Sequence, residues 1–242
     1  MRYDPLVFDR KTVVMQRIAD QVRRGYRWYA VGEVRLDRAK ALVAKFARLY
    51  NVHLHRNQKL RERASGLASA DLLLWQPHTD TIVFCLLVTP GPHAARSLEK
   101  LQDAFARDSR LTLGDYELVQ RPGTGSDRAA WTWRLTNEAY EGWRLRALEV
   151  CRKGNDFEVQ QFIASIHATP GFAGVREQVK KVKALFRVEW KRRRPDGVTV
   201  PALSNRQRYV QRLPNGGRRL ARALAESSTT SQPASCCKPA AG

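Results

Sequence analysis

The sequence predicts an α+β fold whose core is a ferredoxin-like split βαβ arrangement. Two segments, Asp71–Gln76 and Thr81–Thr89, are almost continuously apolar and are separated by the turn sequence PHTD, which is typical of two central strands of one sheet. The elements expected from Arg27 to Leu135 follow the order β-α-β-β-α-β-β, which is the split βαβ plan with one extra strand. Helical periodicity before and after this core predicts an N-terminal helix and a helical, basic C-terminal region.

Capping residues, turn signals and apolar spacing place the other elements. Asp37 and Thr136 are side chains that cap helix N-termini, while Gly25 and Pro195 end helices. The segments 115–121 and 129–135 flank the turn sequence PGTGSDR and predict a hairpin. A strand is expected over 26–34, and helices are expected over 9–24, 37–50, 93–108, 136–153, 157–168 and 172–193.

The domain organisation follows from where composition changes along the chain. We expect an α+β core domain over 1–153, a helical C-terminal subdomain over 154–194 and a basic extension over 195–225. The segment 226–242 is rich in small and polar residues and predicts a disordered tail.

The charge distribution is the strongest functional signal. The formal net charge is +20, but residues 67–150 hold 9 basic and 11 acidic side chains. Residues 1–66 hold 16 basic and 6 acidic side chains, and residues 176–222 hold 15 and 3. Two basic regions that flank a neutral middle favour a polyanionic partner, most often nucleic acid.

The second basic region follows one face of the predicted helix 172–193. Phe172, Val175, Val179, Val182 and Phe186 form an apolar stripe at helical spacing, and the basic residues lie away from it. Their number exceeds what the negative end of a helix needs, so phosphate contact is the simplest explanation. The expected phosphate-binding residues here are Arg176, Lys180, Lys181, Lys183, Arg187, Lys191, Arg192, Arg193, Arg194, Arg206, Arg208, Arg212, Arg218 and Arg219.

The stretch NVHLHRNQKLRERASG joins two histidines to a basic run. In an extended chain His53 and His55 would share one face, as in metal-dependent nucleases that hold Mg²⁺ or Mn²⁺ and attack phosphate with a tyrosine such as Tyr140. A second nuclease alternative, CRISPR-repeat processing, uses a histidine as general base on a ferredoxin-like fold. The surroundings favour a basic connector that touches phosphate and needs no cofactor, through Arg56, Lys59, Arg61 and Arg63.

The cysteines and the hydropathy pattern restrict the remaining classes of protein. Cys85 lies in the apolar run TIVFCLLV and is expected to be a buried free thiol, and the cysteine spacings match no zinc motif. No apolar run is long enough for a membrane span, and the charged N-terminus lacks a signal core. We therefore expect a cytoplasmic protein without membrane contact. On the predicted strand 129–135, Trp131 and Trp133 share a face and are expected in the core.

Three segments carry a resemblance, RAKALVAKFARLYNV, AAWTWRLTNEAYEGW and TPGFAGVREQVKKVKALFRVEWKRRR. They are similar to uncharacterised proteins encoded on integrating conjugative elements and plasmids of Proteobacteria. The resemblance implies a role in DNA maintenance, replication or transfer, with DNA a better partner than RNA, and it supplies no catalytic residues. The sequence thus predicts a nucleic-acid-binding accessory protein of a mobile element, with a nuclease or a subunit of a larger nucleoprotein complex as alternatives.

Overall fold

The structure, a computed structural model, describes residues 3–122, 129–194, 199–204 and 207–230. The chain forms two compact units. Unit 1 comprises residues 1–101 and 213–242, and unit 2 comprises residues 102–212, so unit 2 is an insertion in the sequence of unit 1. This division differs from the predicted boundary at residue 153, because the hairpin expected in the core domain belongs to unit 2.

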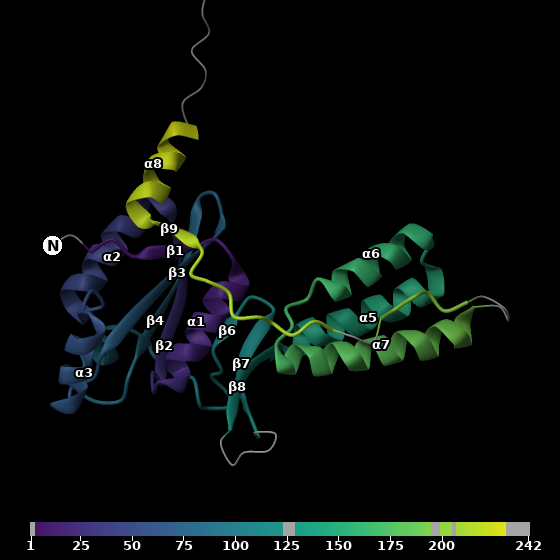
Figure 1. Ribbon diagram of the computed structural model, residues 1–242, viewed down its shortest axis with the longest axis horizontal. Helices are drawn as coiled ribbons and strands as arrows, with labels where there is room; N and C mark the ends of the chain where they lie inside the picture. The colour runs from purple at the N-terminus through teal and green to yellow at the C-terminus, as the bar shows by residue number, and fades with distance from the viewer. Residues whose placement is uncertain (1–2, 123–128, 195–198, 205–206, 231–242) are drawn as a thin grey trace, which may run out of the picture. The chain divides into compact units, whose positions relative to one another are not determined.

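Unit 1 is built on a mixed sheet (Figure 1). β2 and β3 are both antiparallel to β4, which lies between them, while β1 is parallel to β3 and antiparallel to β9. The order of these strands is β2-β4-β3-β1-β9. The apolar run of β4 is buried on both faces, as its sequence indicates. The strands are β1 (Leu6–Phe8), β2 (Trp28–Arg35), β3 (Ala70–His78), β4 (Thr81–Val88) and β9 (Gly217–Arg219).

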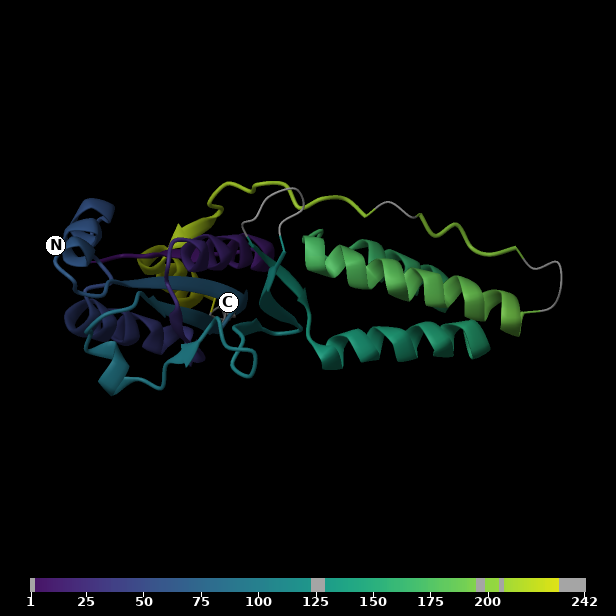
Figure 2. The same ribbon diagram turned by 90° about the horizontal axis from the view of Figure 1, so that it is seen from below.

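Helices cover both faces of this sheet (Figure 2). α1 (Lys11–Arg23) packs on β3 and β4, and α2 (Leu36–Tyr50) packs on β2 and β4 from the other side. α8 (Leu220–Thr230) contacts α2 and β1 and contributes Leu220 to the core. Phe46 and Leu86, which are 1% and 0% exposed, show how α2 and β4 share one apolar core.

Two predicted elements of unit 1 are corrected by the structure. The polar stretch after α2, expected as a connector, forms helix α3 (Arg56–Ala64). The helix expected over 93–108 is reduced to α4 (Ala95–Leu98). Glu99 is extended there and accepts hydrogen bonds from Tyr50 (2.6 Å) and Lys45 (2.9 Å), so tertiary contacts override the local helical preference.

Unit 2 contains the predicted hairpin in a separate small sheet. β6 (Thr112–Leu113), β7 (Tyr116–Arg121) and β8 (Ala130–Leu135) are antiparallel in that order. β5 (Gln102–Asp103) comes earlier in the chain and is not part of this small sheet. The hairpin is therefore confirmed, but it does not extend the sheet of β2, β3 and β4. Trp133 is fully buried, as expected, whereas Trp131 is half-buried against Phe105.

Three long helices complete unit 2 (Figure 1). α5 (Asn137–Lys153), α6 (Asp156–His167) and α7 (Ala173–Arg193) agree closely with their predicted ranges. Thr136 caps α5 as predicted, and Asn155 and Glu158 form a capping box on α6. The ring of Phe162 on α6 stacks on Phe186 of α7 and also contacts Trp143 of α5, so aromatic contacts join the three helices. Among the described residues no helix is both long enough and apolar enough to cross a bilayer.

Candidate nucleic-acid interface

The His-Leu-His stretch forms a turn and a helix start instead of an extended strand. Asn51 ends α2 in a left-handed conformation, and His55 precedes the first residue of α3. His53 Nδ1 lies 3.0 Å from the carbonyl oxygen of Ala47, and the backbone N–H of His55 donates to Gln58. The alternating geometry on which the histidine metal site depended is therefore absent from this stretch. Tyr140 lies in the other unit, on α5.

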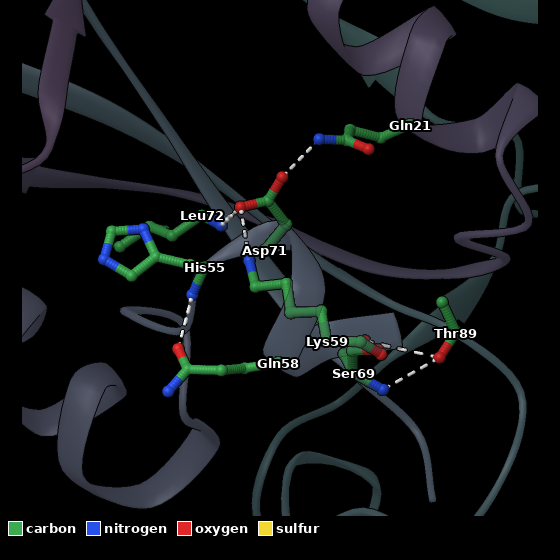
Figure 3. A network of polar contacts seen from close by, with 8 residues as sticks. All are labelled: Gln21, His55, Gln58, Lys59, Ser69, Asp71, Leu72 and Thr89. Atoms are coloured by element: carbon green, nitrogen blue, oxygen red, sulfur yellow. Dashed lines mark hydrogen bonds and ion pairs between the residues drawn. The ribbon is translucent and has the colours of Figure 1, made fainter. Parts of the chain in front are cut away.

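Lys59, expected to touch phosphate, is instead part of a buried polar network (Figure 3). Its Nζ lies 3.1 Å from Asp71 Oδ1, and the side chains of the pair are 10% and 18% exposed. Asp71 also accepts hydrogen bonds from Gln21 and from the backbone N–H of Leu72. Asp71 thus receives three donors, and Lys59 fastens α3 to the beginning of β3. Arg56 and Arg61 are exposed on the same helix, and half-buried Arg63 donates to the carbonyl oxygen of Lys59.

The basic residues at the end of the sequence also hold unit 1 together. Arg218 donates to Glu226 (2.6 Å) and to Gln76 (2.8 Å), and Arg219 donates to the carbonyl oxygen of Asp4. A hydrogen bond from Arg222 is the main cause that lowers the pKa of Glu226. These side chains fix β9 and α8 against β1 and β3, so their first role is structural.

Four basic residues of α7 and its C-cap face protein groups. Lys183 is 2% exposed, and its Nζ donates to the carbonyl oxygen of Ser204 (2.9 Å) and to Gln207 (3.3 Å). Burial lowers the pKa of Lys183, and the nearby Arg187 lowers it further. Arg187 donates to the carbonyl oxygen of Leu203, so both side chains hold the segment after α7. The other two are Arg176, stacked 3.4 Å from the ring centre of Tyr209, and Arg194, which donates to the carbonyl oxygen of Gly154.

The rest of the α7 set faces solvent. Between positions 180 and 193, α7 exposes only basic, alanine and valine side chains, because its one acidic residue there, Glu189, is 9% exposed. Glu189 lies beneath Arg192 (3.4 Å) and Arg193 (3.6 Å). The exposed basic residues of this surface, called the α7 basic face, are Lys180, Lys181, Lys191, Arg192 and Arg193. Arg208 and Arg212 are exposed in the segment after α7, and Arg206 lies outside the described residues.

Sequence reasoning missed two basic residues beside the α7 basic face. The bond between Arg194 and Gly154 joins the C-terminal ends of α7 and α5, and α5 ends with the exposed Arg152 and Lys153. The start of α6 brings Asp156 and Glu158 to the same end. The sequence CRKG at the predicted end of a helix was the available signal, but the antiparallel return through α6 is needed to place it beside α7.

Sequence reasoning also missed a basic groove within unit 2. It has a volume of about 460 Å³ and lies between the segment 107–110, the hairpin of β7 and β8, the start of α5 and the first half of α7. Five basic side chains and the ring of Tyr140 line it. The basic ones are Arg107, Arg110, Arg121, Arg134 and Lys181. We call this cavity the unit 2 groove, and the side chains named here come from four separate parts of the sequence.

A larger cavity in unit 1 has a different character. Its volume is about 710 Å³, and it is lined by both signs of charge. Arg35 pairs with Asp37 at 2.9 Å, and Arg218 pairs with Glu226, so the charges largely satisfy one another. Among the described residues no three His, Cys, Asp or Glu side chains are grouped so that they could hold a metal ion.

Comparisons with protein-family models, with curated proteins and with solved structures found no match to this chain.

Proposed function

We propose that the chain binds nucleic acid and that unit 2 contacts the phosphate backbone through the α7 basic face. One observation carries this proposal: α7 exposes five basic side chains between positions 180 and 193 while its acidic residue there is buried. A solvated helix face normally mixes both signs, because neighbouring like charges destabilise a helix. A face of one sign is favourable when phosphates neutralise it and release their counterions.

Helix capping explains only part of this charge. The C-terminal ends of α5 and α7 each carry about −0.5 elementary charge. The last turns of these two helices, together with Arg194, carry six basic side chains. The acidic side chains near the same end are Glu189, Asp156 and Glu158. The excess of positive charge supports an external polyanion.

The wider role rests on the sequence resemblance. From the resemblance of three sequence segments to proteins of conjugative elements and plasmids, we infer an accessory role in DNA maintenance, replication or transfer, in the cytoplasm and with DNA preferred over RNA. Protein partners in a nucleoprotein complex fit the same role. The order of β2, α2, β3 and β4, with β4 between two parallel strands, supports a ferredoxin-like assignment for unit 1.

The proposal is tested by replacing three residues of the α7 basic face. The variant carries Lys180→Gln, Lys191→Gln and Arg192→Gln, and binding of the full chain to labelled single-stranded and duplex DNA and RNA is measured across a salt series. Each lost phosphate contact lowers the salt slope by about 0.7 to 0.9. We expect the slope to fall by about 2 for every probe that binds.

A matched control removes the same charge from unit 1. Arg38, Lys40 and Arg48 are exposed on α2, and their replacement by Gln is expected to leave the affinity within about twofold, because these residues lie outside the α7 basic face that is proposed to contact phosphate. Absence of binding to all probes at low salt would contradict the proposal. An equal loss in both triple variants would show that net charge alone attracts the nucleic acid.

A further inference from the structure

The unit 2 groove combines positive charge with an aromatic ring. Glu117 pairs with Arg110 (3.2 Å) and Arg134 (2.5 Å), and Glu177 pairs with Arg121 (2.5 Å). Two carboxylates therefore face five basic side chains. Arg107 and Lys181 pair with no acidic side chain in the part of the chain that the structure describes. The groove thus keeps a positive charge after its internal ion pairs are formed.

Three arginines of the groove, Arg110, Arg121 and Arg134, are held by carboxylates before any ligand arrives. Arg134 is fixed by Glu117 on the neighbouring strand, and Arg121 is fixed by Glu177 on α7. An arginine held in this way presents its remaining N–H groups without a large loss of side-chain entropy on binding. Guanidinium groups fixed in this way suit contact with phosphate better than mobile, solvated side chains do.

Tyr140 gives the groove a flat apolar wall. It lies on the first turn of α5, its ring is half-buried, and the guanidinium of Arg144 lies 6.0 Å from the ring centre. Glu141 accepts two hydrogen bonds from Arg144, at 2.8 and 2.9 Å, and this interaction raises the pKa of Arg144. A nucleic-acid base stacks on such a ring only when it is unpaired.

The size of the groove selects between strands. A volume of about 460 Å³ is in the range of roughly 300 to 1,000 Å³ that holds a small ligand, whereas a duplex offers only its outer phosphates to such a site. We propose that the unit 2 groove binds one nucleotide of a single strand, with its phosphate among Arg107, Arg134 and Lys181 and its base on Tyr140. This inference rests on the proposed function and names the substrate class of unit 2.

The test compares neighbouring residues on one helix. Lys181 lines the groove, while Lys180 belongs to the α7 basic face alone. Since Lys181 belongs to both surfaces, we expect Lys181→Gln to weaken binding to a labelled oligothymidylate at least about threefold more than binding to a blunt duplex. Lys180→Gln is expected to weaken both by the same factor. If Lys181→Gln weakens binding to the single strand more than binding to the duplex, the groove proposal is supported. If Lys181→Gln weakens binding to both probes by the same factor, as is expected for Lys180→Gln, the groove proposal is wrong.

Tyr140 supplies an independent test. Loss of base stacking in Tyr140→Leu is expected to weaken oligothymidylate binding about 5- to 100-fold, and Tyr140→Phe, which keeps the ring, is expected to bind within about twofold of the parent. Circular dichroism of each variant checks that α5 remains folded. If Tyr140→Leu binds single strands like the parent, the groove proposal is wrong, while duplex binding through Lys180, Lys191 and Arg192 still decides the proposed function separately.

Discussion

Helices α3 of unit 1 and α7 of unit 2 have similarly basic sequences, but the fold buries the central lysine of α3 and leaves five basic side chains of α7 in solvent. In α3 the central lysine, Lys59, is buried against Asp71 and fastens the helix to the sheet. In α7 the lysines divide between two sides, because Lys183 is buried while Lys180 and Lys181 are exposed. This difference shows that a run of basic residues predicts phosphate contact only where the fold leaves the side chains in solvent.

The largest expected effect comes from removing the buried positive charge of α3. Lys59→Met leaves the mostly buried carboxylate of Asp71 without its cation, and we expect the free energy of unfolding of unit 1 to fall by about 3 kcal/mol. Hydrogen exchange measured by mass spectrometry reads the two units separately. Arg61→Met, an exposed change of the same charge on the same helix, is expected to cost less than about 0.5 kcal/mol. Equal effects of the two changes would refute the structural role of Lys59.

A second prediction concerns how closely α7 is seated in unit 2. A Cβ at position 174 would lie 2.6 Å from the carbonyl oxygen of Trp133, so Gly174→Ala is expected to destabilise unit 2 by about 2 kcal/mol. Gly142 on α5 has open space around its Cα, and Gly142→Ala is expected to stabilise the unit by about 0.5 to 1 kcal/mol. Urea unfolding followed by circular dichroism measures both signs. A gain in stability from Gly174→Ala would show that the close packing of α7 on β8 is absent.

The third prediction separates the two sides of α7. Lys183→Met removes both hydrogen bonds of the Lys183 Nζ and leaves their partly buried acceptors without this donor. Because the variant no longer buries a charge, part of this loss is offset, and we expect the free energy of unfolding to fall by about 1 kcal/mol. Lys180→Met is expected to change stability by less than about 0.5 kcal/mol. The same urea titration compares them. If Lys180→Met were the more costly change, the assignment of buried and exposed sides would be reversed.

The smallest effect is a dependence on pH in unit 1. Burial lowers the pKa of His93 below 6.5, and its Nδ1 accepts a hydrogen bond from the backbone N–H of Ala95 (3.1 Å). Between the lowered folded value and 6.5 the unfolded chain binds more protons, so the free energy of unfolding falls as pH decreases through this range. His93→Asn keeps an acceptor but cannot titrate there. Unfolding at several pH values is expected to show a weaker acid dependence in the variant, and an unchanged dependence would assign it to other groups.

The helices of unit 2 were predictable because their signals are local. Thr136 caps α5, and the apolar spacing of α7 identifies its buried side. The hairpin and the two central strands also follow from turn residues and apolar runs. The buried free thiol of Cys85 was expected from the same apolar run and is confirmed.

The elements that were missed depend on distant contacts. β9 has the sequence GRR, which has no strand preference, and it is a strand because it pairs with β1 from the other end of the chain. α3 is positioned by Asp71, which follows it in the sequence. The unit 2 groove was missed for another reason, since its four arginines, Arg107, Arg110, Arg121 and Arg134, lie in a region whose total charge is slightly negative. Averaging charge along the sequence conceals residues that the fold brings together.

The pairing of β1 with β9 also constrains the order of folding during synthesis. Leu6 pairs with Arg219, and all of unit 2 is translated between them. Unit 2 is contiguous in sequence and can fold while the chain is still emerging, whereas the edge of β1 that faces β9 stays unpaired until β9 has been made. Closing such a long loop is slow, so we expect nascent unit 1 to expose the edge of β1 that β9 covers until β9 has been made, and to need protection from aggregation in that interval.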